Sequence, residues 1–173
     1  MKPALTLCLL ALCGASLQAA GFGLGVQTAF DLDPGQAVAP RLDYQRSTDS
    51  TTAGSDAAPV NLSSTVDMVS LGADYQYYPG GRTGNGLYLQ AGLGLAWARL
   101  DVSGSGPGGS GQATSRQTRP YPEAGLGYAF TSHFGLEVLY RALRFNDVTF
   151  MAGQVPVTYS LTAGLLAGVT VRF

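Results

Sequence analysis

The chain has 173 residues, a formal net charge of −1 and only 12% charged residues. An ordinary soluble domain carries roughly a quarter of charged residues, so a well-solvated globular surface is hard to build from this composition. The near-neutral charge also excludes the usual basic nucleic-acid-binding protein, and we expect no nucleic-acid partner.

The first twenty residues have the features of a cleaved signal peptide. Lys2 supplies a positive charge, residues 4–13 form an apolar core, and small residues at 16–20 suit cleavage after residue 20. We therefore predict a signal peptide over 1–20 and a single domain over 21–173. Cleavage would remove both cysteines, which leaves no thiol for a disulfide or a metal site.

Seven segments downstream alternate apolar residues with small or polar ones at a period of two, which predicts β-strands with two different faces. No segment after residue 20 has the 18 continuous apolar residues of a membrane-spanning helix. In an exported chain of low charge, the remaining structure that can cross a bilayer is a closed barrel. The seven segments are 22–32, 37–46, 64–78, 86–102, 118–130, 134–145 and 157–173.

The connectors between these segments alternate in length. Those at 33–36, 79–85 and 131–133 are turn-sized, whereas three others are long, polar or rich in glycine. Short periplasmic turns and longer external loops are typical of membrane barrels. The second face of the strands is mostly Gly, Ala, Ser, Thr and Gln, which suits a narrow lumen filled by side chains. We predict an all-β fold: a closed, antiparallel, up-and-down transmembrane β-barrel of about eight strands, with exposed loops at 47–63, 103–117 and 146–156.

Three segments carry a resemblance to a known family: Arg119-Pro-Tyr-Pro-Glu-Ala-Gly-Leu-Gly-Tyr-Ala-Phe130, His133-Phe-Gly-Leu-Glu-Val-Leu-Tyr-Arg141 and Ala167-Gly-Val-Thr-Val-Arg-Phe173. The chain resembles small bacterial outer-membrane β-barrel proteins of the OmpA/OmpX type, the outer membrane protein β-barrel domain family. The resemblance implies a location in the cell outer membrane, reached through the periplasm, with outer-membrane lipid and the assembly machinery as partners.

The resemblance also bears on the chain end and the strand count. Val169, Val171 and Phe173 look like the terminal signal that the assembly machinery reads. Family members of this size usually have eight strands, whereas seven are visible here. Either the first strand is absent, or a further strand lies within 47–63.

Isolated charged residues recur at the alternate strand positions that we predict to point into the lumen, which we call the lumen phase. Because burying an unpaired charge is very costly, we predict an ion-pair network that fills the lumen; a proton or ion path is the alternative. The turn at 131–133 would place Glu123 opposite Arg141, roughly 4.5–5.5 Å apart at Cβ. The predicted network is Arg41, Asp43, Asp74, Arg119, Glu123, Glu137 and Arg141, with Asp31 and Arg172 on the same phase.

Little in the chain suggests catalysis. A lipid-modifying enzyme with a serine nucleophile needs a base beside it, and the one histidine, His133, follows Ser132 in a turn expected on the periplasmic side. We predict no enzyme, no catalytic or cofactor-binding residue, no cofactor and no metal. The Gly-x-Gly pairs, such as Gly92 and Gly94, are interpreted as lumen positions where strands need room.

These features favour a structural or surface-interaction protein of the outer membrane, a monomer with exposed loops and a plugged lumen. The alternative is a passive transporter of a small apolar molecule through a lateral opening. A transporter needs an apolar inner path, and the inner phase is small and polar, although Leu139, Leu143 and Leu166 interrupt it.

Overall fold

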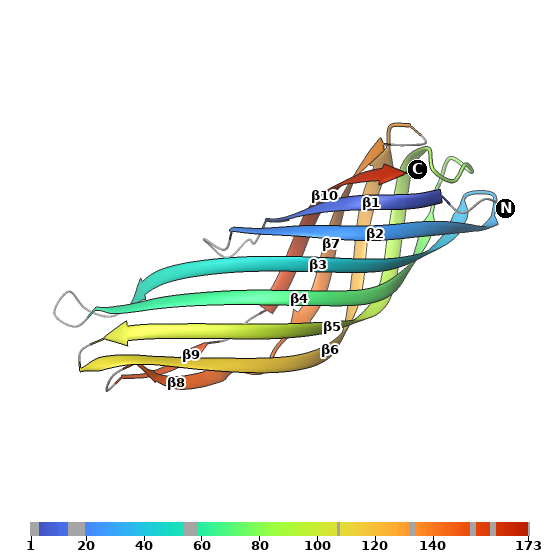
Figure 1. The fold of residues 1–173 in the computed structure, drawn as a ribbon. Coiled ribbons are helices and arrows are strands. Elements are labelled where there is room, and N and C mark those ends of the chain that lie inside the picture. The colour runs from blue at the N-terminus through green and yellow to red at the C-terminus, as the bar shows by residue number, and fades with distance from the viewer. Residues whose placement is uncertain are drawn as a thin grey trace.

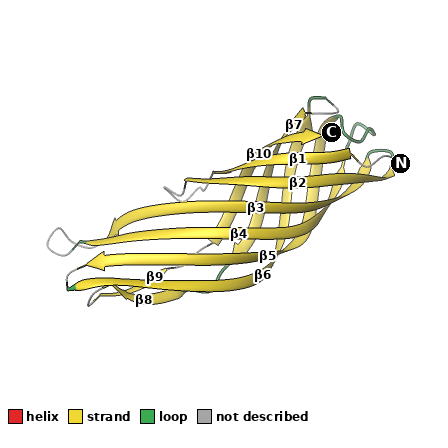
Figure 2. Cartoon of the chain, in the orientation of Figure 1, coloured by secondary structure: helices red, strands yellow, loops and turns green. Residues whose placement is uncertain are grey.

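The computed structural model describes residues 4–13, 20–53, 59–106, 108–131, 134–152, 155–159 and 162–172. Within these ranges the regular structure is entirely β (Figure 2), and none of the described residues forms a helix long and apolar enough to cross a membrane. The strands are β1 (Ala4–Cys13), β2 (Ala20–Asp33), β3 (Gln36–Ala53), β4 (Val60–Tyr77), β5 (Gly86–Gly106), β6 (Gly109–Ala129), β7 (Phe134–Arg144), β8 (Val148–Ala152), β9 (Val155–Tyr159) and β10 (Thr162–Arg172).

Eight of these strands lie side by side in the order β1-β10-β7-β6-β5-β4-β3-β2, and every neighbouring pair is antiparallel (Figure 1). The prediction of an all-β chain with about eight antiparallel up-and-down strands is confirmed. The seven predicted segments correspond to β2 to β7 and β10, with boundaries that differ by several residues.

The eighth strand is β1, which occupies the predicted apolar core of the signal peptide. It pairs with β2 from Ala4↔Ala29 to Cys13↔Ala20, and with β10 from Thr6↔Arg172 to Leu12↔Leu166. The ring of strands therefore closes through β1. Without it, β2 and β10 are the two edges of a seven-stranded sheet.

The long connectors predicted as loops are largely strand. β3 and β4 pair out to Ala53↔Val60, and β5 and β6 pair out to Gly106↔Gly109. Most of the residues there are small, polar or glycine and show no apolar alternation apart from Val60 and Leu62. Two strands that project together from the barrel still keep their backbone hydrogen bonds by pairing with each other. The prediction that 146–156 is a loop was also wrong, because β8 and β9 form a hairpin there.

These extensions make one end of the barrel much longer than the other. We call it the long end; the opposite end, where the turns at 33–36 and 78–85 lie, is the short-turn end (Figure 1). The β8–β9 hairpin lies beside β6 and β5 at the long end. Phe150 and Ala152 of β8 pack there against Val60 and Val102 of the projecting sheet, so the inner face of the sheet is covered.

An apolar band surrounds the part between the two ends. On β5 the outward positions from Leu87 to Trp97 are all apolar, a span of ten residues or roughly 33 Å at ~3.3 Å per residue. A strand tilt of about 40° reduces this to roughly 25 Å, the height of the apolar band of an outer-membrane barrel. Exposed aromatic side chains mark both edges: Tyr44, Trp97 and Tyr140 toward the long end, and Phe30, Tyr75, Tyr77, Tyr128, Phe130 and Phe134 toward the short-turn end.

Candidate functional site

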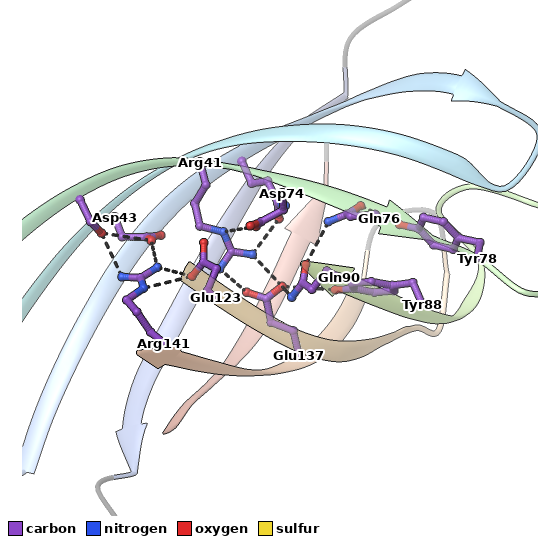
Figure 3. Close-up of polar contacts among 12 residues, drawn as sticks. Arg41, Asp43, Asp74, Gln76, Tyr78, Tyr88, Gln90, Glu123, Glu137 and Arg141 are labelled. Atoms are coloured by element: carbon purple, nitrogen blue, oxygen red, sulfur yellow. Dashed lines mark hydrogen bonds and ion pairs between the residues drawn. The ribbon is translucent and has the colours of Figure 1, made fainter. Parts of the chain in front are cut away.

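The inward faces of four strands place charged side chains together inside the barrel (Figure 3). Six of the seven predicted network residues are each at most 4% exposed. Along each of their strands the side chains alternate between the two faces of the sheet, so every second side chain points into the barrel. The six are Arg41 and Asp43 on β3, Asp74 on β4, Glu123 on β6, and Glu137 and Arg141 on β7.

Arg41 is the centre of one half of this network. Its Nη1 and Nη2 lie 3.0 and 3.1 Å from the two carboxylate oxygens of Glu137, a two-pronged arrangement that is among the stronger charge-assisted contacts. Its Nε lies 3.2 Å from Asp74 Oδ2, and Nη2 donates to Gln27 Oε1 at 3.4 Å. One guanidinium therefore joins β2, β3, β4 and β7.

Arg141 is the centre of the other half. Its Nη2 lies 2.8 Å from Glu123 Oε2 and 2.9 Å from Asp43 Oδ2, and Nη1 donates to Ser70 Oγ at 3.0 Å. The guanidinium carbon also lies 4.2 Å from the centre of the Tyr121 ring, within the range of a cation–π interaction. This half joins β3, β4, β6 and β7.

The two halves together cross the lumen twice. In the eight-strand order, β3 and β7 are separated by three strands in either direction. Arg41 of β3 reaches Glu137 of β7, and Arg141 of β7 reaches Asp43 of β3. All four side chains have zero exposure. The ion pairs therefore span the lumen between opposite walls.

Neutral polar side chains continue the network toward the short-turn end. Tyr88 Oη and Gln90 Nε2 both donate to Glu137 Oε2 at 3.3 Å. Gln76 Nε2 donates to Gln90 Oε1 at 3.2 Å, and Tyr78 Oη donates to Gln76 Oε1 at 3.1 Å. The Tyr78 and Tyr88 rings pack with centroids 5.1 Å apart. This end of the lumen is therefore filled by hydrogen-bonded and stacked side chains.

Toward the long end the lumen filling becomes apolar. Tyr121 is followed by a buried cluster in which Met68, Leu100 and Leu143 pack with Val148 of β8. The inner surface thus changes from ion pairs to hydrocarbon before it reaches the hairpin.

Glycines make room for the inward aromatic rings. A Cβ on Gly94 would overlap the Tyr121 ring and would lie 2.7 Å from Leu71 O, and a Cβ on Gly127 would overlap the Tyr88 ring. A Cβ on Gly92 would overlap the Asp74 carboxylate. The interpretation of the Gly-x-Gly pairs as positions where strands need room agrees with these contacts.

Several predicted residues lie elsewhere. Arg119 is on the predicted phase but only partly buried, and it makes no ion pair within 4 Å with a described residue; its direct partner on β5 is Ala96. Asp31 is directly opposite the buried Ala37 and so is on the predicted phase, but it lies exposed near the end of β2, outside the buried network, where solvent hydrates the charge.

The remaining predicted positions are only partly within the structure. Val169 and Val171 pair with Leu136 and Phe134 of β7. Phe173, Ser132 and His133 lie outside the described residues, and of Arg172 only the backbone is described.

Sequence reasoning missed the neutral members of the site. Gln27, Ser70, Gln76, Gln90 and Tyr121 share the inward phase with the charges, and all contact them directly or through one another. The signal was present, because amide side chains at inward positions need buried partners. Among the described residues, no three His, Cys, Asp or Glu side chains are arranged to hold a metal ion.

No curated protein matches the sequence significantly. Solved structures match over nearly the whole chain. They include the N-terminal β-barrel domain of Pseudomonas aeruginosa OprF (19% identity, 98% of this chain and 97% of that chain, TM-score 0.51) and the attachment invasion locus protein Ail of Yersinia pestis in complex with sucrose octasulfate (15%, 99% and 96%, 0.52). A major outer membrane protein of Thermus thermophilus also matches (16%, 100% of both chains, 0.53).

These similarities concern the fold. The family model of the outer membrane protein beta-barrel domain matches residues 7–160, most of the chain. This match agrees with the all-β strand order and the apolar band described above. The chain belongs to the outer membrane protein beta-barrel domain family.

Proposed function

We propose that this protein is a non-catalytic component of the outer membrane, whose barrel is an anchor with a sealed lumen and whose long end displays an interaction surface. Family membership implies the outer-membrane location, and the apolar band of roughly 25 Å supports it. By the family pattern, the longer extensions face outward and the short turns face the periplasm.

The observation that best supports a sealed lumen is the pair of reciprocal ion pairs between opposite walls of the barrel. Arg41–Glu137 and Arg141–Asp43 cross the same cross-section in opposite directions, and all four side chains are inaccessible to solvent. An ion that passes through would have to break charge-assisted hydrogen bonds in a medium of low dielectric constant, where unpaired charges are very costly.

A passage for an apolar molecule is less well supported. The apolar inner surface at the long end is packed by β8 rather than open, since Val148, Phe150 and Ala152 are buried against the sheet. Below it, Arg141 and its carboxylate partners would face an apolar molecule directly. Sealing therefore agrees better with the side chains than lateral transport does.

Conductance in a planar lipid bilayer tests the sealed lumen. We expect the wild-type protein to add no steady conductance to the bilayer. The double variant R41A/R141A should produce transient conductance events. Because this variant removes both cross-lumen bridges, its folding is first verified by heat-modifiable electrophoretic mobility. R82Q is a charge-changing control in the turn at the short-turn end. A steady conductance of the wild-type protein would contradict the proposal, as would accelerated entry of an apolar dye into vesicles that contain it.

Assembly is the second part of the proposal. We propose that the terminal residues Val169, Val171 and Phe173 are recognised by the outer-membrane assembly machinery, and that the protein functions as a monomer in lipid. Deleting Phe173 should slow membrane insertion while the protein still reaches the periplasm. Insertion at the wild-type rate would show that the signal lies elsewhere.

A further inference from the structure

The buried network contains more carboxyl groups than guanidinium groups. Among the side chains that the structure describes, Arg41 and Arg141 face four acidic groups, and all six are inaccessible to solvent. Arg119 makes no ion pair within 4 Å with any of them. A buried charge without a counter-charge is very costly, so the network needs at least one further positive charge. The four acidic groups are Asp43, Asp74, Glu123 and Glu137.

Two of these acidic groups meet across a glycine. Gly92 of β5 is the direct partner of Asp74 on β4 and of Glu123 on β6. The backbones of β4 and β6 are about 9.5 Å apart there, two strand spacings. Gly92 has no side chain to separate them, and the Asp74 carboxyl group occupies the space that a Cβ on Gly92 would take. The Asp74 and Glu123 carboxyl groups therefore lie within hydrogen-bonding reach of each other.

The contact between Asp74 and Glu123 lacks a hydrogen-bond donor when both groups are ionised. A carboxylate only accepts hydrogen bonds, whereas a protonated carboxyl group donates one. Asp74 Oδ1 and Glu123 Oε1 are both buried, and neither accepts a hydrogen bond from a described residue. Two like charges held this close in a buried site do not both remain ionised. One proton on the pair supplies the missing donor and also reduces the excess of negative charge.

The surrounding arginines determine which of the two groups carries the proton (Figure 3). Glu123 Oε2 accepts hydrogen bonds from Arg141 Nε and Nη2 at 3.0 and 2.8 Å. Asp74 Oδ2 has one contact with a guanidinium, at 3.2 Å from Arg41 Nε. The terminal nitrogens of Arg41 are already bound to the two carboxylate oxygens of Glu137. Because charge-assisted hydrogen bonds favour the ionised form, Glu123 is the acceptor and Asp74 is the donor.

We propose that Asp74 holds a proton at neutral pH and donates a hydrogen bond to Glu123, so that the lumen contains a proton-binding site. This site joins the half of the network centred on Arg41 to the half centred on Arg141. The inference goes beyond the sealed lumen, because it adds a bound proton to the folded barrel. The ionisable groups that surround the pair are Arg41 and Asp43 on β3, Tyr88 on β5, Tyr121 on β6, and Glu137 and Arg141 on β7.

A proton held by Asp74 makes folding depend on pH. In the unfolded chain both carboxyl groups are ionised above about pH 5, so unfolding releases the proton. Because the folded state binds one more proton than the unfolded state, this contribution to stability falls as the pH rises. The dependence begins at about pH 5 and ends where the folded pair loses its proton. An asparagine at position 74 can accept from Arg41 and donate to Glu123 without a proton, so D74N should lack this dependence.

The protonation state of Asp74 can be measured directly by nuclear magnetic resonance. The protein is labelled with ¹³C at the aspartate side-chain carboxyl groups and studied in detergent micelles. We expect the Asp74 carboxyl carbon to have the chemical shift of a protonated acid at pH 7. The outward Asp101, whose pKa is lowered by its hydrogen bonds to Thr114 and Arg99, should have the shift of an ionised carboxylate. D74N identifies the Asp74 signal by its loss, and the measurement itself is made on the wild-type protein.

The pH dependence of unfolding tests the same proton thermodynamically. Between pH 6 and 7 the unfolding equilibrium constant of the wild-type protein should rise about tenfold more per pH unit than that of D74N. D101N is the matched control, an aspartate outside the lumen, and should keep the wild-type dependence. E123Q, whose amide can donate to an ionised Asp74, should behave like D74N and replaces it if D74N does not fold. Heat-modifiable mobility verifies the folding of each variant.

The chemical shift of an ionised carboxylate at Asp74 at pH 7 would overturn the inference, as would equal pH dependence in wild type and D74N. Neutralisation by a bound metal cation would give an ionised Asp74 and unfolding that responds to Na⁺ concentration rather than to pH, which also contradicts the proposal. A barrel that does not conduct but has an ionised Asp74 would refute only the proton site. A conducting barrel with a protonated Asp74 would refute only the sealed lumen, so the two proposals fail separately.

Discussion

The Arg141 guanidinium and the Glu123 carboxylate are direct neighbours across β6 and β7, and their Nη2 and Oε2 atoms lie 2.8 Å apart inside the barrel. The same Arg141 nitrogen also lies 2.9 Å from Asp43 on the opposite wall. The group to consider in mutagenesis is therefore a triad.

The first prediction concerns this triad. Arg141→Met should destabilise the barrel by roughly 3–5 kcal/mol, because it leaves two buried carboxylates without their cation. The double variant E123Q/R141M should recover only part of this loss, since Asp43 is still unpaired. The triple variant D43N/E123Q/R141M should recover most of it. Urea unfolding in lipid vesicles gives the free energies of unfolding; full recovery in the double variant would show that Asp43 contributes little.

The period-two pattern was sufficient to predict the pair Glu123–Arg141, because a short turn determines which residues are opposite each other in an antiparallel pair. It could not predict that Arg41 contacts Glu137. That contact crosses the lumen between strands that are not neighbours. The distance between these two walls depends on how many strands close the ring. A single strand's alternation carries no information about that number.

The long end was predicted poorly for a related reason. Alternation identifies a strand only while its two faces differ in polarity. In 47–53, 103–106 and 109–117 both faces carry mostly small polar residues or glycine, although Val60 on the neighbouring β4 is inward and buried. The β8–β9 hairpin was interpreted as a loop, because Val148 to Ala152 is too short for its period to be distinctive.

The second prediction concerns the packing of Tyr121 on Gly94. Gly94→Ala should destabilise the barrel by about 1–3 kcal/mol, because the added methyl group would overlap the ring and approach the backbone oxygen of Leu71. Gly80→Ala is the matched control, since a Cβ there has no neighbour within 4 Å. Equal free energies of unfolding for the two variants would show that the ring moves aside at no cost.

The third prediction concerns pH. The hydrogen bond from Thr114, followed by that from Arg99, lowers the pKa of the exposed Asp101 carboxyl below its ordinary value of 3.8. A lowered pKa in the folded state means that the stabilising contribution is present above 3.8 and disappears as the pH falls through the folded value. Amide exchange at the outer ends of β5 and β6 should therefore be faster in D101N than in wild type at pH 5–8. The two proteins should become alike well below pH 3.8; a difference that persists there would assign the effect to something other than this ionisation.

The last prediction concerns the strand that closes the ring. β1 coincides with the predicted signal-peptide core, so cleavage after Ala20 would remove it. Because β2 and β10 are each antiparallel to β1, they would then become parallel neighbours, an arrangement known for odd-stranded mitochondrial barrels. We predict that protein isolated from the membrane begins at Gly21 by mass spectrometry.

Disulfide formation distinguishes the two architectures. Leu24 and Val169 are both opposite Leu9 of β1, so with β1 present they are about 9.5 Å apart, two strand spacings. A disulfide needs Cα atoms roughly 4.4–6.8 Å apart. The variant L24C/V169C should therefore cross-link in the processed protein. L24C/Y44C, whose positions are direct partners on β2 and β3, is the positive control that should cross-link in either case. If the membrane protein retains residues 1–20 and only the control pair cross-links, β1 is the eighth strand of the working barrel.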